Sequence, residues 1–221
     1  MSKASKMSSI FRTDQADDRP DGRMSSPSAT RNAEPILATL RTELDGLTGL
    51  ALEIGSGTGQ HITEWAAAFP DMHWQPSDPF DVHLDSVRAW VAAAGCTNVR
   101  APIWLDAAED WPNLGKLSLA IAVNVIQITP WVVTEGIFRG ASKALQPGGK
   151  LVFYGPFREG GAHTGEGNAK FDATLRAQDP SWGIRDIDDL SALGEQHALA
   201  RPAIHVMPAN NRMLVFDRVA P

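Results

Sequence analysis

The segment LEIGSGTGQH, at residues 52–61, restricts the possible folds of this chain more than any other feature. A short apolar run leads into glycines at every second position, Gly55, Gly57 and Gly59, and a helical pattern follows directly. Glycine lets the backbone turn tightly and lets a ligand approach the main chain closely. A glycine loop between a strand and a helix is typical of open α/β sheets, which bind ligands at the carboxyl ends of their strands.

The rest of the chain continues this alternation of strand-like and helical segments. The strand-like runs lie at 50–54, 73–77, 98–105, 117–128 and 150–155, and the helical patterns at 61–69, 82–95 and 131–145. Such alternation predicts an α/β fold with a mostly parallel sheet and helices on both faces. Two further strands around the turn residues PANN, within 203–219, predict an antiparallel pair at one edge of the sheet.

The two ends of this pattern define the predicted domain. Residues 1–28 are rich in Ser, Asp, Arg, Pro and Gly and show no periodicity, which predicts a disordered tail followed by one domain at 29–221. The first helix is expected to have Asn32 as its N-cap and Pro35 in its first turn. The glycine-rich segment 155–168 predicts a lid over the substrate, because loops of this length are usually functional or disordered.

Composition argues against several classes of function. The formal net charge is −6 and the basic residues form no stripe, so no nucleic-acid partner is expected. No apolar stretch reaches the roughly 18 residues of a membrane span, so no membrane partner is expected. The single cysteine, Cys96, fits a reducing compartment and predicts a cytoplasmic location. The histidines lack the paired spacing of a metal site, so no metal is expected.

The loop spacing and the acids beyond it indicate the kind of ligand. A dinucleotide loop reads G-x-G-x-x-G, whereas Gln60 stands here in place of its last glycine. Glu53, just before the loop, would repel a pyrophosphate and attract a cation. Asp78 closes the second strand and can accept hydrogen bonds from ribose hydroxyls, and Asp106 follows the third strand, where it can meet an adenine amino group. These residues suit a positively charged nucleoside without phosphates, a description that S-adenosylmethionine fits.

Seven motifs together resemble a known family. They are RNAEPIL, LEIGSGTGQH, WQPSD, NVIQITPW, GGKLVFYGPF, FDATLRAQDPSWGIRD and MPANN. The chain resembles the class I S-adenosylmethionine-dependent methyltransferases, and more narrowly the methyltransferase-like protein 26 family, also called domain of unknown function 938. The likeness runs from about Arg31 to Arg218. It implies a Rossmann-like, seven-stranded methyltransferase sheet whose last strand is antiparallel, S-adenosyl-L-methionine as cofactor and S-adenosyl-L-homocysteine as product, but no particular acceptor.

The end of the fourth strand shows where this chain departs from related patterns. The methyltransferase pattern implies that Asn124 lies near the sulfonium and the incoming nucleophile. NVIQ replaces the Asn/Asp-Pro-Pro-Tyr of the N6-adenine and glutamine methyltransferases, which argues against amino-group transfer of that kind. Gln127 stands where similar chains usually carry histidine, so a catalytic base at that position would be missing here.

The resemblance and the predicted strand ends together give a set of candidate residues. The predicted cofactor-binding residues are Arg31, Asn32, Glu53, Gly55, Ser56, Gly57, Gln60, Asp78, Leu105, Asp106, Asn124, Val125 and Ile126. The predicted substrate-binding residues are Trp131, Tyr154, Phe157, Asn168, Phe171, Trp182, Arg185 and Asn210. The predicted catalytic residues are Asn124, Tyr154 and His163.

Three functions are compatible with these residues. A methyltransferase acting on a small molecule is favoured, because the chain is acidic and a glycine-rich lid with aromatic residues follows the fifth strand. A non-catalytic module that binds the same nucleoside stays open, because no general base is obvious. An NAD-linked oxidoreductase is disfavoured by the G-x-G-x-G spacing and by Glu53. The atom that receives the methyl group and the choice between monomer and homodimer also stay open.

Overall fold

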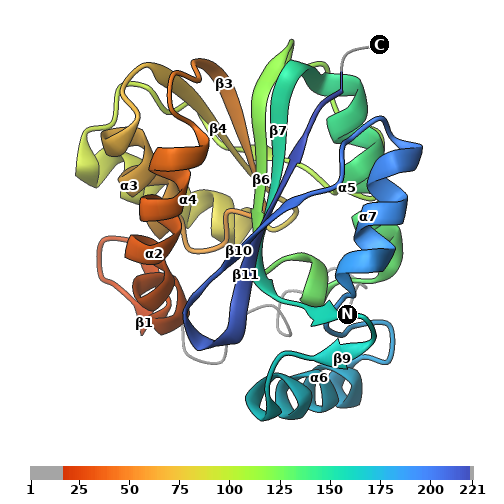
Figure 1. Cartoon of the computed structure of the whole chain (residues 1–221). Coiled ribbons are helices and arrows are strands. Elements are labelled where there is room, and N and C mark those ends of the chain that lie inside the picture. The colour runs from red at the N-terminus through yellow and green to blue at the C-terminus, as the bar shows by residue number, and fades with distance from the viewer. Residues whose placement is uncertain (1–16, 220–221) are drawn as a thin grey trace.

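Residues 17–219 of the chain are described in a computed structural model, shown in Figure 1. Seven strands form one sheet in the order β10-β11-β7-β6-β3-β4-β5. The strands are β3 (Gly49–Ile54), β4 (Met72–Asp78), β5 (Ile103–Trp104), β6 (Leu117–Val123), β7 (Leu145–Pro156), β10 (Ala203–Val206) and β11 (Asn211–Asp217). Strand β11 runs antiparallel to both β7 and β10, whereas the other neighbouring pairs are parallel. The predicted α/β fold with an antiparallel C-terminal strand is confirmed.

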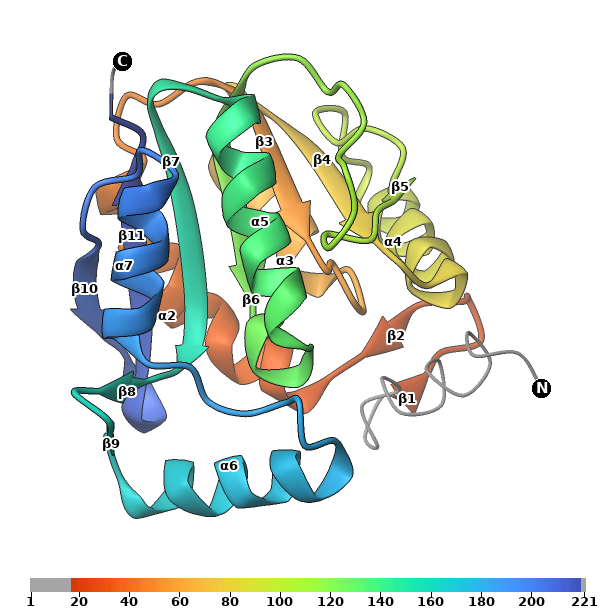
Figure 2. The same cartoon turned by 90° about the vertical axis from the view of Figure 1, so that its right-hand side faces the viewer.

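Helices cover both faces of the sheet, as the side view in Figure 2 shows. One face packs against α2 (Pro27–Glu43), α3 (Gln60–Ala68) and α4 (Asp81–Ala94), and the other against α5 (Trp131–Ala144) and α7 (Ile187–Gln196). Each face has its own hydrophobic core, the first centred on side chains such as Trp65 and the second on side chains such as Phe138. The two cores hold the strands rigidly, and the strand ends therefore form a fixed base for a site.

The two central strands, β3 and β6, are largely apolar because both of their faces are buried. In β6, Leu119 and Ile121 pack on the face covered by α2 and α3, whereas Leu117 and Ala120 pack on the face covered by α5. Successive side chains of a strand point to opposite faces, so a strand buried on both faces becomes a continuous apolar run. The sequence pattern of β6 follows directly from this packing.

Two strands are shorter than predicted. Strand β6 ends at Val123, because Asn124 adopts a left-handed backbone conformation with a φ angle of 55°. Strand β5 holds only two residues, and Val99, earlier in the same predicted strand, makes a separate bridge to Trp74. Pro102 lies between these two contacts, and proline has no backbone N–H to continue the hydrogen-bond ladder.

The N-terminal segment differs from the predicted tail. Residues 1–16 lie outside the described residues, so for them the disordered tail stays a prediction. The residues after them form a short antiparallel pair, β1 (Asp17–Asp18) and β2 (Met24–Ser25), and then enter α2. The backbone N–H of Met24 donates to Ser86 Oγ at 2.8 Å, and that of Ser26 donates to Gln60 Oε1 at 2.6 Å. Such bonds to distant residues leave no local pattern in the sequence.

Helix α2 begins earlier than predicted, at Pro27 rather than after Asn32. Proline suits the first helical position, because the N–H that it lacks would have no partner inside the helix there. Pro35 therefore lies within the helix, where it removes one backbone hydrogen bond. Ile36 and Leu40 are fully buried in the core, and this packing keeps the helix continuous.

The segment after β7 forms an extension at the carboxyl end of the sheet (Figures 1 and 2). It consists of β8 (Arg158–Glu159), β9 (Ala162–His163) and α6 (Glu166–Gln178), and it contains the predicted lid. The short 3-10 helices η1 (Ile126–Ile128) and η2 (Pro208–Asn210) lie at the same end. Within residues 17–219, no helix is both long enough and apolar enough to cross a membrane.

Candidate functional site

A cavity of about 370 Å³ opens where the carboxyl ends of β3, β4, β5 and β6 meet. It lies at the strand edge that the glycine loop predicted. Nine of the predicted cofactor-binding residues line it: Glu53, Gly55, Ser56, Gly57, Asp78, Leu105, Asp106, Asn124 and Val125. Because these residues come from four separate strand ends, the fold rather than the local sequence brings them together.

The loop between β3 and α3 requires glycine for two separate reasons. Gly55 and Gly59 have φ angles of 69° and 87°, a region that residues with a Cβ rarely adopt. A Cβ on Gly55 would lie 2.7 Å from Val125 Cγ2, and one on Gly59 would lie 2.9 Å from Val87 Cα. Gly57 has no atom within 4 Å of its Cβ position, so its backbone borders open space. A ligand in the cavity can therefore approach the main chain at Gly57.

Glu53 is the most deeply buried acid of the cavity, with an exposed fraction of 2 %. Burial raises the pKa of its carboxyl to about 8, and the negative charge of Asp78 adds to the rise, whereas a hydrogen bond with Ser56 opposes it. Its Oε2 atom has no hydrogen-bond partner among the described residues. Buried polar atoms without partners are costly, so this atom is a candidate for ligand contact.

The Asp78 carboxylate is fixed by three donors. The backbone N–H of Gly57 donates to Oδ2 at 2.9 Å, and that of Phe80 donates to Oδ1 at 3.0 Å. His83 Nδ1 lies 2.9 Å from the same Oδ1 atom. These bonds join the glycine loop, the end of β4 and the first turn of α4 around one carboxylate, which holds it in a defined orientation at the cavity wall.

Asp106 and Asn124 complete the polar part of the wall. Asp106 follows β5, and its Oδ1 accepts a hydrogen bond from the backbone N–H of Ala108 at 2.9 Å. Asn124 takes the left-handed conformation that asparagine tolerates better than most residues, and its N–H donates to the Tyr154 carbonyl at 2.8 Å. A Cβ on Gly155 would lie 3.0 Å from Asn124 Oδ1, so this glycine leaves room for the asparagine side chain.

The cavity also has lining residues that sequence reasoning missed, among them two histidines. His61 lies in the first turn of α3 and stacks on Trp65, with ring centroids 5.4 Å apart. Burial lowers the pKa of His61 to about 4, so its ring is neutral at neutral pH. His83 lines the cavity beside Asp78, to which it is hydrogen-bonded. His61 stood within the glycine-loop motif and so had a sequence signal, whereas the His83 contact depends on the turn of α4.

The N-terminal segment contributes three further lining residues that were missed. Ser26, Ser28 and Ala29 border the cavity at the start of α2. They fall in or next to the segment predicted to be a disordered tail. The hydrogen bond from Ser26 to Gln60 places them there, and that bond crosses 34 positions of the chain.

Four predicted cofactor-binding residues do not line this cavity. Gln60 is used within the protein, because it accepts from Ser26 N and Thr58 Oγ1 and donates to Thr30 Oγ1. Ile126 is 1 % exposed and belongs to the core. The other two lie on α2, where Arg31 is exposed and Asn32 is half-buried.

None of the predicted substrate-binding residues lines the cavity. Apart from Trp131 and Arg185, they lie in a second region around β7, the lid and the residues that pack on it. Tyr154 and Phe157 are almost fully buried, and the Tyr154 hydroxyl accepts a hydrogen bond from Asn211 Nδ2 at 3.1 Å. Trp182 is also buried, whereas Phe171 is exposed. The structure therefore separates these residues from the acids of the cavity.

Arg185 and Trp131 support the loop that borders the cavity. Arg185 Nε donates to the Ile126 carbonyl at 2.9 Å, and its Nη2 donates to the Thr129 carbonyl at 2.5 Å. The guanidinium also stacks over the Trp131 ring, 5.6 Å from the centroid. These contacts fix η1 and the residues after it, which gives both side chains a structural role.

The predicted lid is tied to the β10–β11 hairpin. Asn168 Nδ2 donates to Thr164 Oγ1 at 2.9 Å and to the Asn210 carbonyl at 3.1 Å. His163 Nε2 lies 3.6 Å from Asp172 Oδ2.

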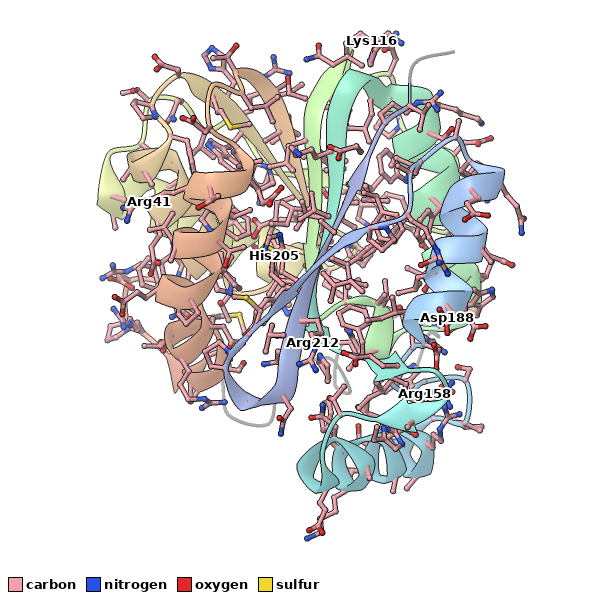
Figure 3. The ribbon with its side chains drawn as sticks, viewed as in Figure 1. Arg41, Lys116, Arg158, Asp188, His205 and Arg212 are labelled. Carbon is pink, nitrogen blue, oxygen red and sulfur yellow. The ribbon has the colours of Figure 1, made fainter. Side chains whose placement is uncertain are left out.

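Two arginines that Figure 3 labels lie at the junction between the lid and the sheet. Arg212 Nε donates to Glu159 Oε1 at 2.7 Å, and Arg158 Nε lies 4.0 Å from Asp186 Oδ2. The lid thus forms a packed extension at the same end of the sheet as the cavity.

Comparison with known proteins identifies the family and the fold of the chain. The profile of a family described as "Protein of unknown function (DUF938)" matches residues 23–218. An O-methyltransferase family protein from Burkholderia thailandensis superposes with a TM-score of 0.75 at 13% identity, over 87% of this chain and 58% of that chain. For the mitomycin 7-O-methyltransferase the TM-score is 0.74 at 17% identity, over 87% and 54%.

Human N-acetylserotonin methyltransferase, solved in complex with SAM, is a third structure with the same fold. Its TM-score is 0.69 at 13% identity, over 87% of this chain and 53% of the human chain. The present chain spans a little over half the length of these proteins. At such low identities the likeness establishes the fold, which is the seven-stranded fold of the methyltransferases.

Proposed function

The chain belongs to the family described as "Protein of unknown function (DUF938)", and we propose that it transfers a methyl group from S-adenosylmethionine to a small molecule. One observation carries the proposal. Three acidic side chains, those of Glu53, Asp78 and Asp106, line the cavity, and none of its described lining residues is Lys or Arg. S-adenosylhomocysteine would be the second product.

The charge of the cavity favours this ligand over a dinucleotide. A pyrophosphate needs cationic side chains or free N–H groups around it, whereas the carboxylates of Asp78 and Asp106 would oppose its charge in a partly buried site. A sulfonium and an ammonium group are cations, and the unpaired Oε2 atom of buried Glu53 is a suitable acceptor for one of them. The residues present therefore fit the methyl donor better than NAD.

We assign one part of the ligand to each acid. Glu53 and the glycine loop would hold the methionine end, Asp78 the ribose, and Asp106 the adenine. When bound, S-adenosylmethionine supplies a methyl group on a cationic sulfur, which is transferred as the acceptor attacks. Val125, Ile128 and Val133 provide apolar walls that exclude water and help to hold the reacting groups in line.

The solved structures with this fold support a small-molecule acceptor. They include a mitomycin 7-O-methyltransferase and a human N-acetylserotonin methyltransferase, whose names both refer to small acceptors. The net charge of −6 favours such an acceptor over a nucleic acid. The second region, with Tyr154 and His163, is the proposed acceptor side, because it adjoins the cavity through the hydrogen bond from the Asn124 N–H to the Tyr154 carbonyl.

One observation favours a second candidate function, a non-catalytic module that binds the same nucleoside. Tyr154 is 1 % exposed, and neither it nor His163 lines the cavity. These two predicted catalytic residues therefore do not border the proposed binding site of the methyl donor. A methyl-transfer assay distinguishes the two functions, because a binding module binds S-adenosylmethionine without transferring its methyl group.

The proposal is tested on the full chain in two steps. Isothermal titration calorimetry should give binding of S-adenosylmethionine and S-adenosylhomocysteine and no binding of NAD. Incubation with S-adenosylmethionine labelled on the methyl group and a panel of small phenols, amines, thiols and carboxylic acids should then transfer the label. Absence of binding would refute the proposal, and binding without transfer to any compound of the panel or of a cell extract would favour the non-catalytic module.

A further inference from the structure

His83 stands next to Asp78 at the cavity and is held there from two sides. It lies in the first turn of α4, and its Nδ1 atom is 2.9 Å from Asp78 Oδ1. The Phe80 ring meets the imidazole edge-on, with ring centroids 5.6 Å apart. The side chain of His83 is 11% exposed and lines the cavity. The imidazole therefore has a fixed orientation in the wall beside Asp78.

Asp78 alone has limited capacity for the two hydroxyls of a ribose. An ionised carboxylate offers about four acceptor positions. Three of them are already taken in this structure, by the N–H groups of Gly57 and Phe80 and by His83 Nδ1. Oδ1 carries two of these bonds and Oδ2 only one, so one position remains, on Oδ2. Two ribose hydroxyls need a second partner close by.

His83 has the atom that can serve as this partner. A carboxylate only accepts hydrogen bonds, so Nδ1 is a protonated ring nitrogen and donates its hydrogen bond to Asp78. The other ring nitrogen, Nε2, makes no hydrogen bond to any residue within 17–219 and is not among the fully buried unpaired atoms of that part. A hydroxyl both donates and accepts, so it can bond Nε2 whether or not that nitrogen carries a proton.

We propose that His83 and Asp78 together bind the ribose of the methyl donor, with one hydroxyl on Asp78 Oδ2 and the other on His83 Nε2. This inference rests on the proposed function, because it needs an adenosine in the cavity. It makes His83 a cofactor-binding residue and makes the site selective for a ribose that carries both hydroxyls.

Two substitutions separate the two nitrogens of the ring. In His83→Asn the amide nitrogen can take the place of Nδ1 and keep the bond to Asp78, but nothing replaces Nε2. In His83→Gln the longer amide can reach the place of Nε2, but the bond to Asp78 is lost. His73→Asn is the matched control, because His73 is exposed on β4 and does not line the cavity.

The test measures the affinity of each protein for S-adenosylhomocysteine and for its 2′-deoxy and 3′-deoxy analogues by calorimetry. In the wild type and the control, loss of either hydroxyl should weaken binding about three- to tenfold. In His83→Asn, binding of S-adenosylhomocysteine should weaken by a similar factor. The variant should no longer discriminate against one of the two analogues, while it still discriminates against the other. Circular dichroism and thermal melting confirm that each variant is folded.

Opposite outcomes are distinguishable. If His83→Asn discriminates against both analogues as the wild type does, His83 does not bind a hydroxyl and the inference is overturned, with the proposed function intact. Weaker binding by His83→Gln alone would then show that His83 only positions Asp78. If the wild type binds neither S-adenosylhomocysteine nor its analogues, the proposed function itself is wrong and the inference is refuted with it.

Discussion

The cavity and the lid region lie at the same end of the sheet but differ in the space beside their polar side chains. In the cavity, Glu53, Asp78 and Asp106 border an open volume of about 370 Å³. In the lid region, Tyr154 is 1 % exposed and pairs with Asn211, and Asn168 pairs with two groups of the neighbouring loops. Buried polar atoms without a partner occur in both regions, Glu53 Oε2 and His61 Nδ1 in the cavity and Arg158 Nε and His163 Nδ1 in the lid region. The proposed cofactor half of the site is thus open, whereas the proposed acceptor half is closed by its own side chains.

The largest expected effect concerns the unpaired acid. The pKa of Glu53, raised by burial from 4.5 to about 8, means that the folded protein holds this proton more tightly than the unfolded chain. This stabilisation is complete below about pH 4.5 and is lost as the pH rises towards about 8. Between these two pH values, the free energy of unfolding of the wild type should therefore fall by roughly several kcal/mol more than that of Glu53→Gln. Urea denaturation at a series of pH values measures it, and a constant difference between the two proteins would contradict the assignment.

Asp78→Ala should have the next largest effect. The substitution removes the acceptor of three donors and the proposed ribose contact, so affinity for S-adenosylhomocysteine should fall by about 2–3 kcal/mol. The melting temperature should also fall, because His83 and two backbone N–H groups lose their acceptor. Asp71→Ala, at an exposed acid just before β4, is the control and should bind normally. Equal affinities of the two variants would remove the ribose assignment.

The affinity of the wild type should depend on pH. The ammonium group of the ligand binds the ionised form of Glu53, which is the minor form below its pKa of about 8. Affinity for S-adenosylhomocysteine should therefore rise by up to about tenfold per pH unit, roughly 1.4 kcal/mol, as the pH approaches 8, and then level off. Calorimetry across this range measures the change. Glu53→Gln should show a weaker affinity without this rise, and a rise that persists in the variant would point to another group.

Tyr154→Phe tests the second region, around β7 and the lid, and should have the smallest effect on stability. The substitution removes one hydrogen bond, to Asn211, and should lower the free energy of unfolding by about 1 kcal/mol. Binding of S-adenosylhomocysteine should not change, because Tyr154 does not line the cavity. Methyl transfer should decrease if the acceptor enters at this side. A large loss of cofactor affinity would show that the two regions are not separate.

Much of the fold and of the cavity lining could be predicted from the sequence. Strands buried on both faces appear as apolar runs, and Glu53, Gly57 and Asp78 stand at strand ends, where a local pattern places them on one edge of the sheet. The position of His83 at the cavity and that of the N-terminal segment depend on hydrogen bonds to residues far away or around a turn, and these leave no periodic signal. The burial of Tyr154 could not be predicted either, because it depends on the neighbouring strand β11, which pairs with β7 only in the assembled sheet.

If the acids of the cavity hold the methyl donor, a crystal structure with S-adenosylhomocysteine bound will show it. The amino group should lie near Glu53, the ribose hydroxyls at Asp78 and His83, and the adenine beside Asp106. The side of the sulfur from which the methyl group has left should face Asn124 and the second region. A ligand bound elsewhere, or one whose ribose contacts neither Asp78 nor His83, would show that these acids do not hold the methyl donor.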